Sequence, residues 1–239
     1  EETLTSDDTS TVDNVNDPPK GKPIIANVRK ILCLHGGGES VNRFSNQTGI
    51  QNLQTSLSGD YIFEFLSASG DDNIDGIWWN DPPSKDQPTT AENWAKATIE
   101  KINQKIINDG PYYGLLGYSQ GAAACIVWDA FNRESENSLY VNKILLFCGY
   151  LPITHTGLIN VIDRNAPSNT RTLIFLGEQD VNFYRLGQAI KDKFNNSEEV
   201  RDSGVGHYVP TSSDEKYDDV LIFILSLIHI SEPTRHDQI

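Results

Sequence analysis

The stretch GLLGYSQGAAAC, residues 114–125, joins an apolar run to a run of small residues through a single serine, Ser119. The residues before the serine are typical of a buried strand, and GAAACIVWDAF after it favours a helix. A sharp strand-to-helix turn pushes its serine outward, and Gly117 and Gly121 would let the strand and the helix approach closely. The pattern predicts an exposed nucleophile at Ser119. The alternative is a glycine-rich turn that is structural or binds phosphate.

Short apolar runs alternate with helical patterns on both sides of this turn. The helix over 90–109 has capping-box spacing at Thr89 and Glu92, and Gly110-Pro111 should end it. Several strands are apolar on both faces, as in a parallel sheet covered by helices. We therefore expect one α/β domain over 25–224, with a mostly parallel central sheet and helices on both faces. The expected strands are 29–36, 60–68, 112–119, 142–150, 170–180 and a weak one at 198–202; the other expected helices are 41–57, 120–134, 182–194 and 213–224.

The two ends of the chain differ from this pattern. Residues 1–24 are polar and acidic, so we expect a disordered tail. Residues 225–239 resemble a translated sequencing-library adapter, and we expect them to be non-native. The chain has no methionine, which suggests that the true amino terminus is missing. The apolar run at 220–230 is too short to span a bilayer.

The net charge and the cysteines bear on the partners and the location of the protein. The formal net charge is −14, and the Lys and Arg residues are scattered, so a nucleic-acid partner is not expected. Cys33, Cys125 and Cys148 lie in apolar stretches with neither metal-site nor disulfide spacing. We expect buried, reduced thiols and a cytoplasmic location.

A serine hydroxyl needs a base before it can act as a nucleophile. Two histidines that follow Ser119 are candidates for this base, His155 and His207. His207 lies in the glycine-rich segment SGVGHYVP, between the weak strand and the last helix, whereas His155 lies in a polar loop. His207 is therefore the better candidate.

The base needs an acidic residue to orient it, and the chain order serine, acid, histidine is one common arrangement. Asp180 ends the apolar strand TLIFLGEQD and precedes His207 with room for further elements between them. Asp163 and Asp192 are expected on helices or at their edges, where a solvated carboxylate is the default. The sequence favours Asp180.

Three glycines, Gly36–Gly38, follow the first strand in LCLHGGGES. Backbone N–H groups in such a loop can stabilise an oxyanion. A dinucleotide site is the competing interpretation, but the glycine spacing is wrong and no acidic residue ends a second strand. His35 is expected to hold this loop rather than to act as a base.

Together these features resemble the FSH-type serine hydrolases, which are small α/β-hydrolases. The family includes fungal polyketide-releasing thioesterases and the ovarian-cancer-associated hydrolase. The resemblance covers roughly residues 28–224 and implies an α/β-hydrolase fold with a minimal lid. The motifs that carry it are ILCLHGGGES, GIWW (76–79), GPYYGLLGYSQGAA (110–123), LLFCGYLP (145–152), GEQD (177–180) and GHYVP (206–210).

The resemblance also implies roles for individual residues. Ser119 matches the nucleophile, Asp180 the orienting acid and His207 the general base. The backbone amides of Gly37 and Gln120 match the oxyanion hole.

Two of these assignments stay open. This chain has small residues where many members have a bulky one after the first His-Gly, so Gly36 or Gly38 are alternative oxyanion donors to Gly37. Trp78 and Trp79 are expected either to border an acyl pocket or to serve as core packing or a lid anchor.

The sequence thus predicts a serine hydrolase that cleaves a small-molecule ester or thioester through an acyl-enzyme. No metal and no organic cofactor is required for this chemistry, and the oligomeric state is open. The alternatives are a non-enzymatic protein of this fold that binds an acyl ligand or a partner, and a peptidase.

Overall fold

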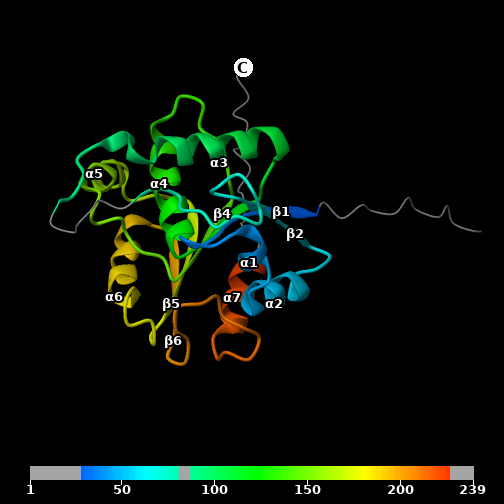
Figure 1. Cartoon of the computed structure of the whole chain (residues 1–239). Coiled ribbons are helices and arrows are strands. Elements are labelled where there is room, and N and C mark those ends of the chain that lie inside the picture. The colour runs from blue at the N-terminus through cyan, green and yellow to red at the C-terminus, as the bar shows by residue number, and fades with distance from the viewer. Residues whose placement is uncertain (1–27, 81–86, 227–239) are drawn as a thin grey trace, which may run out of the picture.

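The computed structural model describes residues 28–80 and 87–226. Over these residues six strands form one open sheet in the order β2-β1-β3-β4-β5-β6, and every neighbouring pair is parallel (Figure 1). The expected parallel α/β sheet is confirmed, including its weak last strand. The strands are β1 (Arg29–Leu34), β2 (Tyr61–Leu66), β3 (Gly114–Tyr118), β4 (Lys143–Phe147), β5 (Arg171–Gly177) and β6 (Ser197–Asp202).

Helices cover both faces of the sheet, and the strands alternate their side chains between two apolar layers. In β1, Ile31 and Cys33 pack into one layer, whereas Leu32 and Leu34 pack into the other. Because both layers exclude water, the buried positions of β1, Ile31–Leu34, are all apolar. Helices α1 (Val41–Ser45), α2 (Thr48–Ser56) and α7 (Tyr217–Leu225) cover the first face; η1 (Glu92–Ala95), α3 (Lys96–Asp109), α4 (Gln120–Glu134), α5 (Thr156–Asn165), α6 (Tyr184–Gly187) and η2 (Gln188–Lys193) belong to the second.

Helix α4 packs closely on the sheet because its first turn lacks bulk. A Cβ added to Gly121 would lie 2.3 Å from the carbonyl oxygen of Leu34, and one added to Gly117 would lie 2.4 Å from that of Gly121. Real Cβ atoms do not approach backbone oxygens so closely. Both glycines around Ser119 are therefore required by packing, as the sequence suggests.

Several helix boundaries differ from expectation. The helix expected over 41–57 is two helices, because the chain turns at Asn46 and Gln47 between α1 and α2. The capping box is wrong: the Thr89 hydroxyl accepts the N–H of Ala91 at 3.2 Å, and a 3₁₀ turn begins at Glu92. No range given for an expected helix covers α5, although Asp163, which is expected on or beside a helix, lies in it.

Lys143, the first residue of β4, is buried and serves the end of α7. Its ammonium donates to three backbone carbonyls there, at 2.5–2.9 Å, which are those of Phe223, Ile224 and Ser226. This replaces the missing helical partners of these carbonyls.

Most of the two terminal segments lies outside the residues that the structure describes, so the expectations for them stay predictions. The expected acidic tail over 1–24 and residues 227–239 of the adapter-like stretch are outside the described residues. Among the helices that the structure describes, none is long and apolar enough to cross a membrane.

Candidate active site

Ser119 occupies the turn between β3 and α4. Its backbone has φ 53° and ψ −118°, a conformation that non-glycine residues rarely adopt. The turn is held from both sides: the N–H of Ser119 donates to the Phe147 carbonyl at 2.9 Å, and the N–H of Ala122 donates to the Ser119 carbonyl at 3.0 Å. The expected sharp strand-to-helix turn is present, and Ser119 is partly exposed in it.

The hydroxyl of Ser119 is the first member of a continuous hydrogen-bonded chain. His207 Nε2 lies 2.9 Å from Ser119 Oγ, and His207 Nδ1 lies 2.5 Å from Asp180 Oδ2. The carboxylate is buried, and its other oxygen accepts the N–H of Phe183 at 3.1 Å. An ionised carboxylate only accepts, so Nδ1 carries the proton and Nε2 is free to accept from the serine.

These three side chains come from loops that follow β3, β5 and β6. Parallel strands end at the same edge of the sheet, so residues far apart in sequence meet there. The other candidate base, His155, begins α5 instead and is fully buried. Its ring nitrogens pair with the Thr154 hydroxyl and the Asn80 carbonyl.

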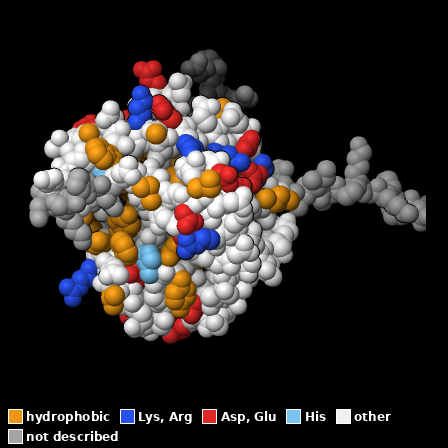
Figure 2. Space-filling model, in the orientation of Figure 1, with side chains coloured by type: hydrophobic (Ala, Val, Ile, Leu, Met, Phe, Trp, Pro, Cys, Tyr) orange, Lys and Arg blue, Asp and Glu red, His pale blue; other side chains and the backbone are white. Residues whose placement is uncertain are grey.

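Aromatic rings flank the imidazole of His207. The ring of Phe183 stacks on it with centroids 4.7 Å apart, and the ring of Tyr118 lies at 5.2 Å. The Tyr118 hydroxyl also donates to the His207 carbonyl at 2.7 Å. On the face of the molecule drawn in Figure 2, hydrophobic side chains gather near a histidine. Val181 and Tyr208, which directly follow the acid and the histidine, are both exposed.

The glycine loop after β1 presents one unoccupied amide. The Gly36 N–H donates to Glu39 Oε2 at 3.1 Å, and the Gly38 N–H donates to the Gly76 carbonyl at 2.9 Å. The Gly37 N–H has no hydrogen-bond partner within the described part of the chain. Gly37 also lies against the elbow, because a Cβ added there would lie 2.7 Å from Gln120 Oε1.

The side chain of His35 holds the glycine loop through two hydrogen bonds. Its Nε2 accepts the N–H of Ala68 at 3.0 Å, which leaves Nδ1 to donate to the Gly36 carbonyl at 2.8 Å. Burial lowers the pKa of His35, and both contacts require the neutral ring. These contacts agree with the structural role expected for His35.

The side chain of Gln120 has a role that sequence reasoning missed. Its Oε1 accepts the Trp78 N–H and its Nε2 donates to the Trp79 carbonyl, both at 3.0 Å. Trp78 is tied further, because its indole N–H donates to the His35 carbonyl at 2.8 Å. One amide therefore fastens the tryptophan loop to the turn that carries Ser119.

Two cavities border these residues. One of about 280 Å³ lies between the His207 loop and the start of α2, and it is lined by Gln47, Thr48, Gly49, Tyr118, His207, Tyr208, Val209 and Thr211. The second, of about 440 Å³, is bounded by Ile77, Trp78, Trp79, Asn80, Trp94, Ala97 and Thr98. Both indoles of the tryptophan loop are more than nine-tenths buried and belong to the apolar core.

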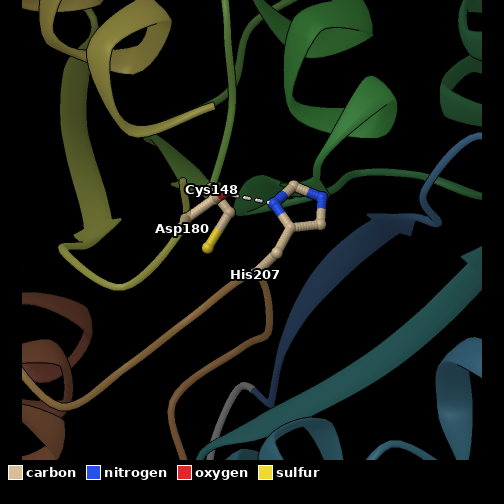
Figure 3. Close-up of side chains that lie close together, drawn as sticks. All are labelled: Cys148, Asp180 and His207. Carbon is tan, nitrogen blue, oxygen red and sulfur yellow. Dashed lines mark hydrogen bonds and ion pairs between the residues drawn. The ribbon is translucent and has the colours of Figure 1, made fainter. Parts of the chain in front are cut away.

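Cys148 joins Asp180 and His207 in a compact cluster (Figure 3). Their potential ligand atoms lie within 4.8 Å of one another, which invites comparison with a metal site. The thiol, however, faces the backbone carbonyls of Gly206 and Tyr208, and burial raises its pKa to about 12. Both ring nitrogens of His207 already form hydrogen bonds, Nδ1 with Asp180 and Nε2 with Ser119. The donor set therefore fits proton transfer better than metal coordination.

Solved structures with a similar fold include a thioesterase and a carboxylesterase. The acyl-protein thioesterase 2 of Zea mays has a TM-score of 0.59 and 16% sequence identity, and the match covers 85% of this chain and 95% of that one. A carboxylesterase from Mesorhizobium loti has a TM-score of 0.54 and 14% identity, over 82% and 88% of the two chains. These likenesses show that the fold is that of the α/β-hydrolases, as expected.

Curated relatives are similar at the level of sequence. "Esterase OVCA2" of Xenopus tropicalis is 24% identical over 211 residues, covering 79% of this chain and 89% of that protein. "Esterase FUS5" of Gibberella fujikuroi is 28% identical over 213 residues, covering 80% and 85%. The profile of the family described as "Serine hydrolase (FSH1)" matches residues 25–218, which is most of the chain. The resemblance noted in the sequence is thereby confirmed, and the chain belongs to the serine hydrolase (FSH1) family.

Proposed function

We propose that the protein hydrolyses carboxylic esters or thioesters through an acyl-enzyme formed on Ser119. The observation that carries this proposal is the unbroken hydrogen-bonded chain from Ser119 through His207 to Asp180. Family membership and the esterase names of the relatives support the reaction class.

The first half-reaction acylates the serine. Ser119 Oγ attacks the carbonyl carbon while His207 Nε2 accepts its proton, and Asp180 stabilises the resulting imidazolium. The imidazolium then donates that proton to the departing alcohol or thiol as its bond to the carbonyl carbon breaks. In the second half-reaction His207 takes a proton from water as the water attacks the acyl carbon, and the imidazolium then returns that proton to Ser119 Oγ as the bond between Oγ and the acyl carbon breaks and the acid is released.

The oxyanion of each tetrahedral intermediate would be held by two backbone amides. Gln120 follows the nucleophile at the amino terminus of α4, where N–H groups lack helical partners. Gly37 is the second donor in this proposal, because the amides of its neighbours Gly36 and Gly38 are already engaged. The hydrogen bonds of those neighbours thus favour Gly37 over the alternative registers.

The acyl group would lie along apolar surface near the tryptophan loop. Trp78 and Trp79 line the cavity of about 440 Å³, and the Gln120 amide connects their backbone to the nucleophile turn. The exposed side chains of Val181 and Tyr208 add apolar surface beside the catalytic residues. We propose these tryptophans as one border of the acyl site.

The test of this function uses Ser119→Ala with Ser58→Ala, an exposed serine, as the matched control. The Ser119 variant should lose esterase turnover by about 10⁴–10⁶-fold and should no longer react with a fluorophosphonate probe, whereas the control keeps both. Matched p-nitrophenyl esters, acyl thioesters and anilides of one acyl chain would separate esterase, thioesterase and peptidase activity. A wild-type protein that neither turns over these substrates nor reacts with the probe would favour a non-enzymatic acyl-binding role.

A further inference from the structure

We propose that the Cys148 thiol positions His207 for catalysis by holding the loop that carries it. Cys148 would be a positioning residue, because it acts on the imidazole through the backbone carbonyls on either side of His207. The inference rests on the proposed function in that it presumes a catalytic role for His207.

The Cys148 thiol lies against the loop at the two residues that flank His207. Cys148 Sγ is 3.4 Å from the Tyr208 carbonyl oxygen and 3.6 Å from that of Gly206, the two neighbours of His207. The carbonyl between them, that of His207 itself, accepts the Tyr118 hydroxyl at 2.7 Å. Three consecutive carbonyls are thus held by two side chains.

The protonation state of the thiol suits this task. Burial, and secondarily the charge of Asp180, raises the pKa of Cys148 to about 12, so the group is a donor at neutral pH. Its single proton is shared between two carbonyls, of which that of Gly206 also accepts the Tyr208 N–H at 3.1 Å. For the Tyr208 carbonyl, the thiol is the one donor found among the described residues.

The backbone of Cys148 is shaped to aim this side chain. Its φ is 48°, in the left-handed region that disfavours residues with a Cβ. The residue follows β4 directly, and its N–H donates to the Phe175 carbonyl at 3.0 Å, which fixes it against β5. A strained conformation held in this way at a candidate active site is consistent with a functional constraint.

The position of β4 in the sheet places Cys148 between the strands that lead to Ser119 and to Asp180. Strand β4 lies between β3, which leads into Ser119, and β5, which leads into Asp180. The thiol therefore lies beside the other two side chains, with its sulfur within 4.8 Å of both an Asp180 oxygen and a His207 nitrogen (Figure 3). A shift of the loop would move the imidazole relative to both of its partners at once.

The test compares Cys148→Ala, which removes the donor, with Cys148→Ser, which keeps one. Cys33→Ala is the control, because Cys33 is also a buried thiol, with its sulfur 3.7 Å from a strand carbonyl on β1. We expect Cys148→Ala to lower kcat by about tenfold to a hundredfold with KM within about twofold of wild type, since loss of alignment affects the transition state. Cys148→Ser should recover most of kcat, and Cys33→Ala should retain it.

A second readout does not depend on turnover. The Nδ1 proton of His207 should give a downfield NMR signal in the wild-type protein, assigned by its loss in His207→Gln. Cys148→Ala should broaden this signal or move it upfield, and Cys148→Ser should restore it. If the alanine variant does not fold, Cys148→Gly replaces it, because glycine suits the positive φ and also lacks the donor.

Three results would overturn the inference. They are an unchanged kcat and NMR signal in the donor-less variant, equal losses in the alanine and serine variants, or an equal loss in Cys33→Ala. Failure of the proposed function itself is distinguishable, because it would show as an inactive, unlabelled wild-type protein whose Nδ1 signal can still be compared between the variants.

Discussion

Replacement of Asp180 by asparagine tests the proton chain most directly, because it changes one atom of a buried group. The carboxylate uses both oxygens: Oδ1 accepts the Phe183 N–H at 3.1 Å and Oδ2 lies 2.5 Å from His207 Nδ1. Asparagine has only one oxygen for these two donors. If that oxygen stays with Phe183, the NH₂ group faces Nδ1, which must then become an acceptor. The imidazole proton would move to Nε2, and the ring could no longer accept from Ser119.

The size of the effect follows from the alternative orientation. Turning the amide around restores the bond to His207 but leaves the Phe183 N–H facing a donor, and an unsatisfied buried donor costs about 1–3 kcal/mol. This preference alone would lower the fraction of protein molecules in which His207 Nε2 can accept the Ser119 proton by a factor of about 5–150. The lost negative charge beside the imidazolium adds to it. We therefore expect kcat to fall by about 10⁴-fold, or about 5.5 kcal/mol, as when a triad acid is neutralised.

The assay is steady-state hydrolysis of a p-nitrophenyl ester together with the rate of fluorophosphonate labelling. Asp163→Asn is the control, because it removes the same charge from an exposed carboxylate that pairs with Lys193 at 2.7 Å. That variant should stay within about twofold of wild type. A folded Asp180→Asn protein with kcat within tenfold of wild type would refute the assignment of the acid.

Three further outcomes are expected. Gly37→Ala should lower kcat by about a hundredfold or more with little change in KM, because its Cβ would lie 2.7 Å from the oxygen of a Gln120 amide group that two hydrogen bonds hold in place; wild-type turnover would contradict the expected displacement of the Gly37 amide. Lys143→Met should lower the free energy of unfolding in urea by about 1–3 kcal/mol, since the Ser226 carbonyl loses its donor, while the carbonyls of Phe223 and Ile224 keep the hydroxyls of Ser226 and Tyr61; the exposed Lys96→Met should change it little. Because burial lowers the pKa of His35 below its ordinary 6.5, the unfolded state binds more protons just below that pH, so stability is complete above pH 6.5 and falls as the solution becomes more acidic. His35→Gln should flatten this acid-side fall in the urea midpoint, and a parallel fall in both proteins would contradict it.

Most of the fold follows from patterns that are local in sequence. The buried strands are short apolar runs, and their ends differ from expectation by a few residues where the sheet hydrogen bonding stops. Helix α5 could have been found, because Leu158, Val161 and Ile162 have the spacing of one helical face. The break between α1 and α2 could not, since no glycine or proline marks it. Helix boundaries of this kind depend on tertiary contacts.

In the candidate site, too, some residues could be predicted from the sequence and others could not. Ser119, Asp180 and His207 could be proposed from motifs, because each lies just beyond a strand or in a glycine-rich loop. The choice among the three loop glycines depends on partners at Glu39 and Gly76, and the latter is remote in sequence. No local pattern encodes such a contact. The same holds for the second role of Gln120, whose partners lie about forty residues earlier in the chain.

The tie between Gln120 and the tryptophan loop has an optical consequence. Indole emission responds to the polarity and mobility of its surroundings, and the elbow residue holds the backbone of two adjacent indoles, Trp78 and Trp79. Trp128, on the same helix as the elbow, is also buried, whereas Trp94 is partly exposed. The turn that carries Ser119 is therefore hydrogen-bonded to the backbone of two tryptophans, and its state can be followed by fluorescence without an added label.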